Sequence, residues 1–235
     1  MRYTLSDLAL MVDHTNLHAD ATEGDLRRLC DEALGHGFRM VAVNSVQSRL
    51  CAGLLAGSDV HVGAAISFPL GQTSVATKVF ETRDAIENGA NEIDYVVNLT
   101  EVKAGNWGYV ADEMARIVEV CREARVPSKV IFENCLLTQD EKIRLCEVAS
   151  EVLPTFVKTS TGFSTGGATV EDVRLMRGHV DARVKVKAAG GIRTADDFLA
   201  MVAAGAERIG CSASVSIMEE FAARMERAGV DYVEI

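Results

Sequence analysis

Three ionisable side chains interrupt otherwise apolar runs of the chain. Asp94 lies in the run EIDYVV, Lys158 in FVKTS and Lys187 in VKVKAAGG. A buried charge is costly unless it is paired or used. If each run is a strand of one barrel, the alternation of side chains allows all three residues to point into its interior. Two close lysines could supply an amine nucleophile, and the carboxylate could move protons.

The pairing of the two lysines decides whether such an amine can react. A free lysine with a pKa of about 10.4 is neutral in only about four molecules per ten thousand at pH 7. A second ammonium about 5 Å away, at an effective dielectric of 20, costs roughly 3 kcal/mol and lowers the pKa by about two units. The alternative interpretation is a purely structural network of ion pairs that closes one end of a barrel.

Glycines follow the same runs and point to an anion site. Gly190 and Gly191 end the run that contains Lys187, Gly162 follows the run of Lys158, and Gly210 and Ser212 lie in RIGCSAS. Barrels often hold a phosphate in the loops after strands seven and eight, where glycine lets backbone N–H groups approach it closely. A glycine pair alone could be a tight turn. Together these residues predict a phosphate site.

Regularly alternating elements must position these side chains. Short β-rich runs alternate with amphipathic segments that tend to begin with Ser, Thr or Asp. Strands are expected at residues 10–13, 39–44, 61–68, 92–98, 129–134, 156–160, 184–189 and 208–212. Helices are expected at residues 22–34, 45–56, 74–88, 109–125, 138–152, 169–179, 194–204 and 213–228. Eight such units without a linker predict a single-domain α/β fold over residues 1–235, a (β/α)8 TIM barrel rather than an open parallel sheet.

Composition narrows the possible partners. Asp and Glu number 34 against 24 Lys and Arg, which gives a formal charge of −10. This charge disfavours nucleic acid and anionic membranes as partners, so an anionic small molecule must be held by a local site. The six cysteines form no C-x-x-C pair and are expected to be reduced thiols. No signal peptide and no membrane span are expected, so a cytoplasmic location is predicted.

Other motifs carry less weight. Residues 162–166, GFSTG, match the G-x-S-x-G pattern, but His179 is the only histidine downstream, which disfavours a serine hydrolase. His14 and His18 have i, i+4 spacing without a third ligand cluster, so no metal is expected. Neither G-x-G-x-x-G nor a P-loop occurs, and no cofactor is expected.

Several of these stretches occur together in one known family. They are DHT at 13–15, FPLG at 68–71, GANEID at 89–94, FVKTSTGF at 156–163, KAAGGIR at 187–193 and RIGCS at 208–212. From residue 13 to about 217 the chain resembles the deoxyribose-phosphate aldolases. The resemblance implies a metal-free class I aldolase that reversibly splits 2-deoxy-D-ribose 5-phosphate into D-glyceraldehyde 3-phosphate and acetaldehyde.

The resemblance also implies roles for individual residues. Lys158 matches the lysine that forms the Schiff base, Lys187 the second lysine that perturbs it, and Asp94 the acid/base that relays protons. The matches to the sugar-binding positions are Asp13, Thr15 and Thr161, and those to the phosphate pocket are Gly162, Gly190, Gly191, Gly210 and Ser212. The expected partners are phosphosugar and aldehyde substrates, and a homo-oligomer is expected.

The chain departs from the family pattern at a few positions. Ala42 stands where many members have a cysteine, and Phe163 where some have a lysine. Tyr232 is a weak match to a tyrosine near the C-terminus of some relatives, and Lys185 shares its face with Lys187 at a deeper position. A different phosphosugar lyase or isomerase and a non-catalytic phosphosugar-binding barrel remain as alternatives.

Overall fold

Eight parallel strands close into a barrel in the computed structural model, which describes all 235 residues. Each strand pairs with the next along the chain, and the last pairs with the first. The closure confirms the predicted (β/α)8 barrel and excludes the open sheet, because no strand of the barrel is left as an edge. The strands are β2 (Val12–Thr15), β3 (Met40–Asn44), β4 (His61–Ile66), β5 (Glu92–Val96), β6 (Ser128–Ile131), β7 (Phe156–Lys158), β8 (Lys185–Ala189) and β9 (Arg208–Cys211).

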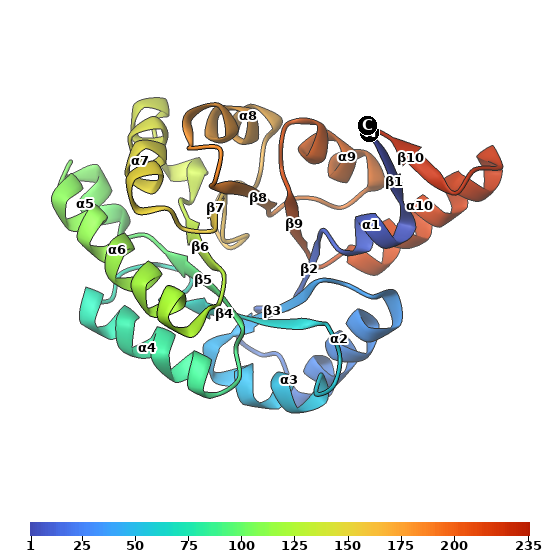
Figure 1. Ribbon diagram of the computed structural model, residues 1–235, viewed down its shortest axis with the longest axis horizontal. Coiled ribbons are helices and arrows are strands. Elements are labelled where there is room, and N and C mark those ends of the chain that lie inside the picture. The colour runs from blue at the N-terminus through green and yellow to red at the C-terminus, as the bar shows by residue number, and fades with distance from the viewer.

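Helices surround these strands on the outside (Figure 1). Thr22, Thr138 and Thr194 each begin a helix with a capping box, in which the threonine side chain accepts the N–H of the third helical residue. The helices between strands are α2 (Glu23–His36), α3 (Ser48–Leu54), α4 (Val75–Glu87), α6 (Trp107–Ala124), α7 (Gln139–Val152), α8 (Val170–His179), α9 (Ala195–Ala203) and α10 (Ser214–Ala228). The shorter helices are α5 (Leu99–Lys103), η1 (Ser45–Gln47) and η2 (Asn134–Leu136).

The two faces of the strands have different chemistry. Outward side chains such as Val41, Ile93 and Val157 belong to one apolar core packed between barrel and helices. Inside the barrel, charged side chains are buried instead. They are Asp13, Glu92, Asp94, Lys129, Lys158, Lys187 and Arg208. Such a charged interior is stable only if its members are paired with one another.

The chain ends form a small separate sheet that was not expected from the sequence. β1 (Arg2–Thr4) pairs antiparallel with β10 (Tyr232–Glu234), so the two termini lie side by side (Figure 1). Thr4 begins α1 (Leu5–Ala9), which leads into the start of β2. Tyr232, the partner of Thr4, therefore lies at the N-terminal end of the barrel, opposite the end where barrel enzymes carry their active sites.

Most of the expected elements differ from the observed ones by a few residues at their ends, and the helix expected at residues 45–56 is divided into η1 and α3. Two of these differences have clear local reasons. The first barrel strand, expected at residues 10–13, begins at Val12, because the capping box of Thr4 and Asp7 starts α1 and Leu10 ends it. The helix expected to end at residue 34 continues to His36, because Gly37 takes the left-handed conformation (φ 68°) that ends a helix.

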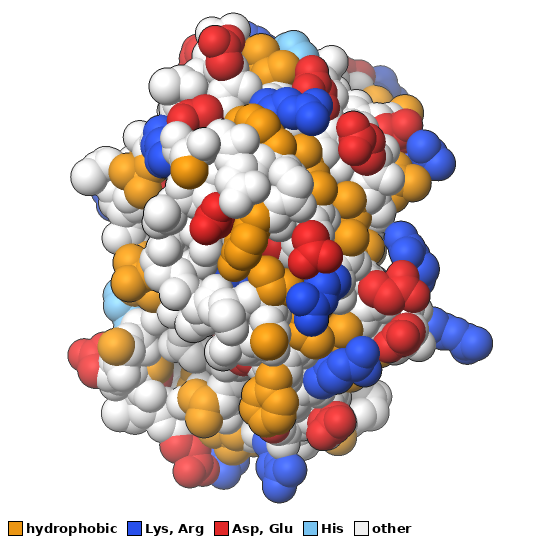
Figure 2. All heavy atoms as spheres, turned by 90° about the vertical axis from the view of Figure 1, so that its left-hand side faces the viewer, with side chains coloured by type: hydrophobic (Ala, Val, Ile, Leu, Met, Phe, Trp, Pro, Cys, Tyr) orange, Lys and Arg blue, Asp and Glu red, His pale blue; other side chains and the backbone are white.

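The outer surface carries charges of both signs. Figure 2 shows the side of the molecule that carries α4 to α7, where Lys and Arg side chains are interspersed with Asp and Glu. Apolar side chains lie between them. None of the helices is both long enough and apolar enough to cross a lipid bilayer.

Candidate active site

A cavity of about 400 Å³ opens at the C-terminal ends of β2, β7, β8 and β9. Its lining contains no Asp or Glu, and its cationic residues are Lys158 and Arg193. In a chain with a net charge of −10, such a lining favours an anionic ligand. The residues predicted from sequence that line it are Thr15, Lys158, Thr161, Gly162, Gly190, Gly191, Gly210 and Ser212.

Bare backbone forms one side of this cavity. Gly190 has φ 85°, and a Cβ on it would lie 3.1 Å from the Cα of Gly167 and 3.3 Å from that of Gly162. The loops after β7 and β8 therefore touch through glycine backbone. The N–H groups of Gly162, Gly190, Gly191 and Ser212 donate to no acceptor within the protein, so they are available to an anion.

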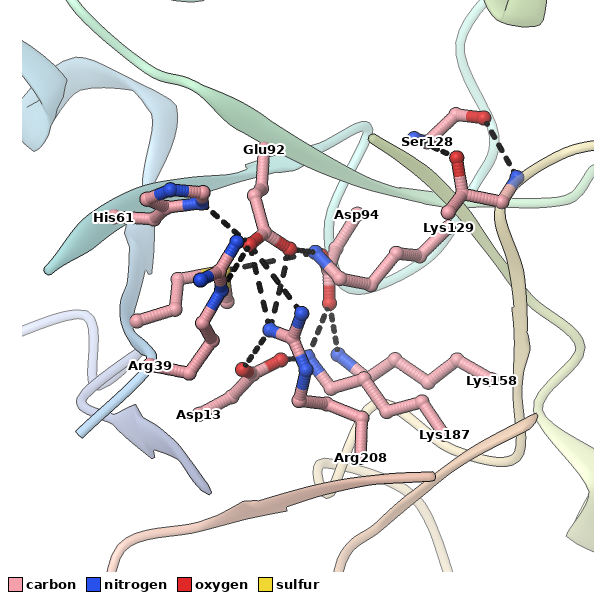
Figure 3. Close-up of polar contacts among 12 residues, drawn as sticks. Asp13, Arg39, His61, Glu92, Asp94, Ser128, Lys129, Lys158, Lys187 and Arg208 are labelled. Carbon is pink, nitrogen blue, oxygen red and sulfur yellow. Dashed lines mark hydrogen bonds and ion pairs between the residues drawn. The ribbon is translucent and has the colours of Figure 1, made fainter. Parts of the chain in front are cut away.

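Lys158 lies at the floor of the cavity, at the end of β7. It faces Lys187 in the register of β7 and β8, and only 3% of its surface is exposed. Its Nζ donates to Oδ2 of Asp94 at 2.9 Å, and the Nζ of Lys187 donates to the same oxygen at 2.7 Å (Figure 3). Because both nitrogens bind the same oxygen, the distance between the two amines cannot exceed the sum of these two hydrogen-bond lengths.

The surroundings of Lys158 lower its pKa from the ordinary value of 10.5 to about 8. Burial is the largest cause, because the ammonium loses its hydration. The negative charge of Asp94 opposes this effect, and the positive charge of Lys187 adds to it. At pH 7 about one molecule in ten then carries the neutral amine. The expected second ammonium contributes, but removal from water contributes more.

Asp94 is held from both sides. Its Oδ1 accepts a hydrogen bond from Lys129 Nζ at 2.6 Å, while Oδ2 is shared by Lys158 and Lys187. Burial favours the protonated acid, yet the ammonium groups of these three lysines hold the pKa of Asp94 well below its ordinary value. The carboxylate is ionised and can accept a proton from either amine at its Oδ2.

Below Asp94 the ion pairs close into a ring (Figure 3). Lys129 contacts Glu92 at 2.6 Å, and Glu92 contacts Arg208 at 3.3 Å. Arg208 contacts Asp13 at 2.6 Å, and Asp13 contacts Lys187 at 2.5 Å. The last contact is an ion pair rather than a hydrogen bond, since that Asp13 oxygen has no partner with hydrogen-bond geometry. Positive and negative groups therefore alternate around the ring.

The predicted sugar-binding residues divide between two levels of the barrel. Thr15 and Thr161 line the cavity. Asp13 does not, because its side chain is fully buried between Lys187 and Arg208. On a strand, a residue two positions before Thr15 points to the same side but one layer deeper. Asp13 supports the site from below instead of lining it.

Several buried ionisable residues near the cavity were not predicted from sequence. Lys129, Glu92 and Arg208 complete the ring, and their positions on inward faces of their strands were the available signal. Glu133 follows β6 with a left-handed backbone (φ 57°), which is rare for a side-chain-bearing residue. Its carboxylate accepts the N–H of Thr161 at 3.2 Å and also the Thr161 hydroxyl.

The two N-terminal histidines lie in different environments. His14 points away from the barrel interior and contacts Glu32 at 2.7 Å and Ser214 at 3.1 Å. Burial lowers its pKa, and the contact with Glu32 opposes this. His18 lines the cavity, and its ring lies 6.0 Å from that of Phe163. No three His, Cys, Asp or Glu side chains in the chain are grouped as metal ligands.

The remaining sequence features lie outside the amine cluster. His179 is at the last residue of α8, where its ring contacts the Leu175 carbonyl, so it forms no triad with Ser164. Lys185 is half-exposed and pairs with Glu207 at 3.2 Å, at the other end of β8 from the cavity. Of the two lysines on β8, only Lys187, two residues further along, reaches Asp94.

The chain has the architecture of the (β/α)8-barrel enzymes, with a buried amine at a cavity whose lining suits an anion. The model of the DeoC/LacD family aldolases matches residues 8–217, and the chain belongs to this family. It is accordingly an aldolase, a carbon–carbon lyase. Similar proteins match the chain along its whole length. The deoxyribose-phosphate aldolase of Lactobacillus acidophilus is 60% identical over 235 residues, 100% of this chain and 99% of the relative.

Less similar proteins match most of the chain in sequence and in fold. The deoxyribose-phosphate aldolase of Thermococcus gammatolerans is 51% identical over 215 residues, 91% of this chain and 96% of the relative. The solved tetrameric structure of the deoxyribose phosphate aldolase of Aeropyrum pernix superimposes with a TM-score of 0.87 at 33% identity. That match covers 94% of this chain and 93% of the other.

Proposed function

We propose that this aldolase reversibly cleaves 2-deoxy-D-ribose 5-phosphate to D-glyceraldehyde 3-phosphate and acetaldehyde through a Schiff base on Lys158. The observation that carries the proposal is the buried Lys158 amine, with a pKa lowered to about 8, on the floor of a cavity without carboxylates. The names of the relatives supply the substrate. The reaction would serve the breakdown of deoxyribose.

Imine formation is the first step. The neutral amine of Lys158 adds to the C1 aldehyde of the open-chain sugar, and loss of water leaves a protonated imine. The amine must first give up its own proton, and Oδ2 of Asp94, 2.9 Å away, is the nearest acceptor. Lys187 shares that oxygen and can pass the proton on.

Bond cleavage follows because the imine withdraws electrons. When the C3 hydroxyl loses its proton, the C2–C3 bond breaks, its electron pair moves toward the imine, and C3 becomes the aldehyde of glyceraldehyde 3-phosphate. The enamine that remains takes up a proton at C2, and water releases acetaldehyde and regenerates Lys158. Asp94 and Lys187 act in these proton transfers.

The cavity lining would hold the rest of the substrate. The phosphate is assigned to the free N–H groups and the hydroxyl around the glycine loops, with Arg193 adding a positive charge. Thr15 and Thr161 offer hydroxyls to the sugar. No metal or cofactor takes part in this scheme.

Trapping the imine tests the proposal. The purified protein is assayed for cleavage of 2-deoxy-D-ribose 5-phosphate, then treated with acetaldehyde and borohydride and mapped by peptide mass spectrometry. We expect cleavage and a reduced adduct on Lys158, and neither in Lys158→Met. Lys185→Met is the matched control, because Lys185 lies on the neighbouring strand outside the cavity. An adduct on another lysine contradicts the assignment, and cleavage of ketose phosphates alone indicates a different phosphosugar lyase.

The location and assembly of the enzyme form a separate proposal. We propose a cytoplasmic homo-oligomer, which the tetrameric relative from Aeropyrum pernix supports. Light scattering during size-exclusion chromatography gives the subunit number, and a monomeric mass at micromolar concentration would contradict the oligomer.

A further inference from the structure

We propose that the ring of six alternating charges below the cavity is a positioning device, which holds Asp94 and Lys187 in place and leaves Lys158 as the buried cation without a carboxylate of its own. The ring consists of Asp94, Lys129, Glu92, Arg208, Asp13 and Lys187. This inference rests on the proposed Schiff-base function and assigns a role to ring members that the reaction itself does not use.

The count of charges is the first argument. The ring contains three carboxylates and three cations, so it is neutral by itself. Protonated Lys158 adds a fourth cation in a place with 3% exposure. Because an unbalanced buried charge is costly, the cluster favours loss of one proton. Arginine does not deprotonate in proteins, which leaves a lysine to lose it.

The geometry selects which lysine this is. Lys129 contacts two carboxylates, Glu92 and Asp94, each at 2.6 Å. Lys187 also contacts two, Asp13 at 2.5 Å and Asp94 at 2.7 Å. Lys158 contacts only Asp94, at 2.9 Å, through an oxygen already used by Lys187. Lys158 is therefore the least stabilised of the three ammonium groups, and it is also the one that lines the cavity.

Packing inside the barrel fixes the ring. Gly210 leaves room for Lys187, since a Cβ there would lie 3.1 Å from the lysine Cε. Gly63 leaves room for Met40, whose sulfur lies 3.6 Å from Lys129 Nζ. Arg208 lies 5.2 Å from the centre of the Phe156 ring. With its neighbours held in this way, Lys129 keeps Oδ1 of Asp94 occupied and directs Oδ2 toward the two other lysines.

The other charged groups near the ring gather at Glu92. His61, from β4, contacts Glu92 at 2.8 Å, and the partly exposed Arg39, just before β3, approaches it at 3.8 Å. The other ion pairs of the cluster join ring members and Lys158, from β2 and from β5 to β9. The Cys211 thiol of β9 faces Asp13 and Lys187 as well, and burial raises its pKa to about 11, so it stays neutral over the tested pH range. Removal of the Lys129 charge makes the net charge of the cluster more negative, and removal of the Glu92 charge makes it more positive.

Two substitutions of opposite sign test the inference. In the unliganded protein, the reactivity of Lys158 toward acetic anhydride is measured against pH by mass spectrometry, beside the pH dependence of cleavage. Lys129→Met removes a cation and releases Asp94, so the midpoint for Lys158 should move about one pH unit upward. Glu92→Gln removes a carboxylate and should move it downward by a similar amount.

The controls separate positioning from general damage. Lys129→Arg should return the midpoint to the wild-type value. Lys78→Met is the matched control, because Lys78 is a fully buried lysine paired with Glu113 at 2.6 Å between α4 and α6, outside the barrel. It should lower stability and leave the midpoint unchanged.

Each result decides between the possibilities. An unshifted midpoint in folded Lys129→Met, or shifts of the same sign in both variants, overturns the inference. If Lys129→Met does not fold, the downward shift in Glu92→Gln decides alone. Opposite shifts in labelling without any sugar-phosphate cleavage support the ring and reject the proposed reaction, so the two hypotheses fail separately.

Discussion

Lys158 and Lys187 are direct neighbours in the register of β7 and β8, and their amines share one oxygen of Asp94. Their roles differ because their surroundings differ. Lys187 has a second carboxylate, Asp13, while Lys158 lies at the cavity. The pair therefore places an amine with one carboxylate contact at the cavity, beside an amine that two carboxylates hold.

Replacement of Lys187 by Leu should slow the reaction and change its pH dependence. Loss of the positive charge, and of the competing donor to Asp94, raises the pKa of Lys158, so the rising limb of the rate profile moves toward alkaline pH. Loss of a proton relay should reduce kcat at neutral pH by about a hundredfold or more. Lys185→Leu on the same strand is the control. An unmoved limb would show that Lys187 does not influence Lys158.

Replacement of Lys158 by Met should stabilise the protein at neutral pH. The folded-state pKa of about 8 lies below the ordinary 10.5, so between these values the unfolded chain binds more protons and stability rises with pH. Below pH 8 the full penalty is present, about 3 kcal/mol, and the variant avoids it. Urea unfolding at pH 7 and pH 10 should show a gain for Lys158→Met that shrinks at the higher pH. A variant that is less stable at pH 7 would argue against a lowered pKa.

Replacement of Ser212 by Ala tests the phosphate pocket. A lost hydrogen bond to a charged group contributes about 1.5 to 3 kcal/mol, so KM for 2-deoxy-D-ribose 5-phosphate should rise by roughly 10- to 100-fold. Cleavage of unphosphorylated 2-deoxyribose should stay unchanged. Ser216→Ala, on α10 but outside the cavity lining, is the control. Equal effects on both sugars would remove Ser212 from the phosphate site.

Replacement of Glu133 by Gln should loosen the loop that follows Lys158. The carboxylate accepts two hydrogen bonds from Thr161, and an amide offers one acceptor oxygen in its place. A buried donor left without a partner costs about 1 to 3 kcal/mol of stability. We expect a several-fold higher KM with a smaller change in kcat, measured by steady-state kinetics. Unchanged KM with lowered stability would make Glu133 purely structural.

Local signals in the sequence were sufficient for the barrel and for the main candidates. Caps at Thr22, Thr138 and Thr194 act within a few residues, and the two-residue period of a strand places Asp94 and Lys158 on inward faces. The glycines after β8 indicated a close backbone approach only together with Gly162, Gly210 and Ser212 after the neighbouring runs. Such features depend on neighbours in the chain, so a single sequence reveals them.

Closure of the barrel decided the rest. Lys185 and Lys187 lie on the same face of β8, but only Lys187 is at the same height in the barrel as Asp94 and contacts it. Lys185 pairs with Glu207 instead. The same layering placed Asp13 below the cavity, and pairing of the chain ends took Tyr232 to the opposite end. Contacts between strands that are far apart in sequence depend on how the barrel closes and on the stagger of its strands. The burial of a side chain depends on which distant residues cover it. Sequence therefore determined which residue types are available for chemistry, and tertiary structure decided which amine lies at the cavity with a lowered pKa.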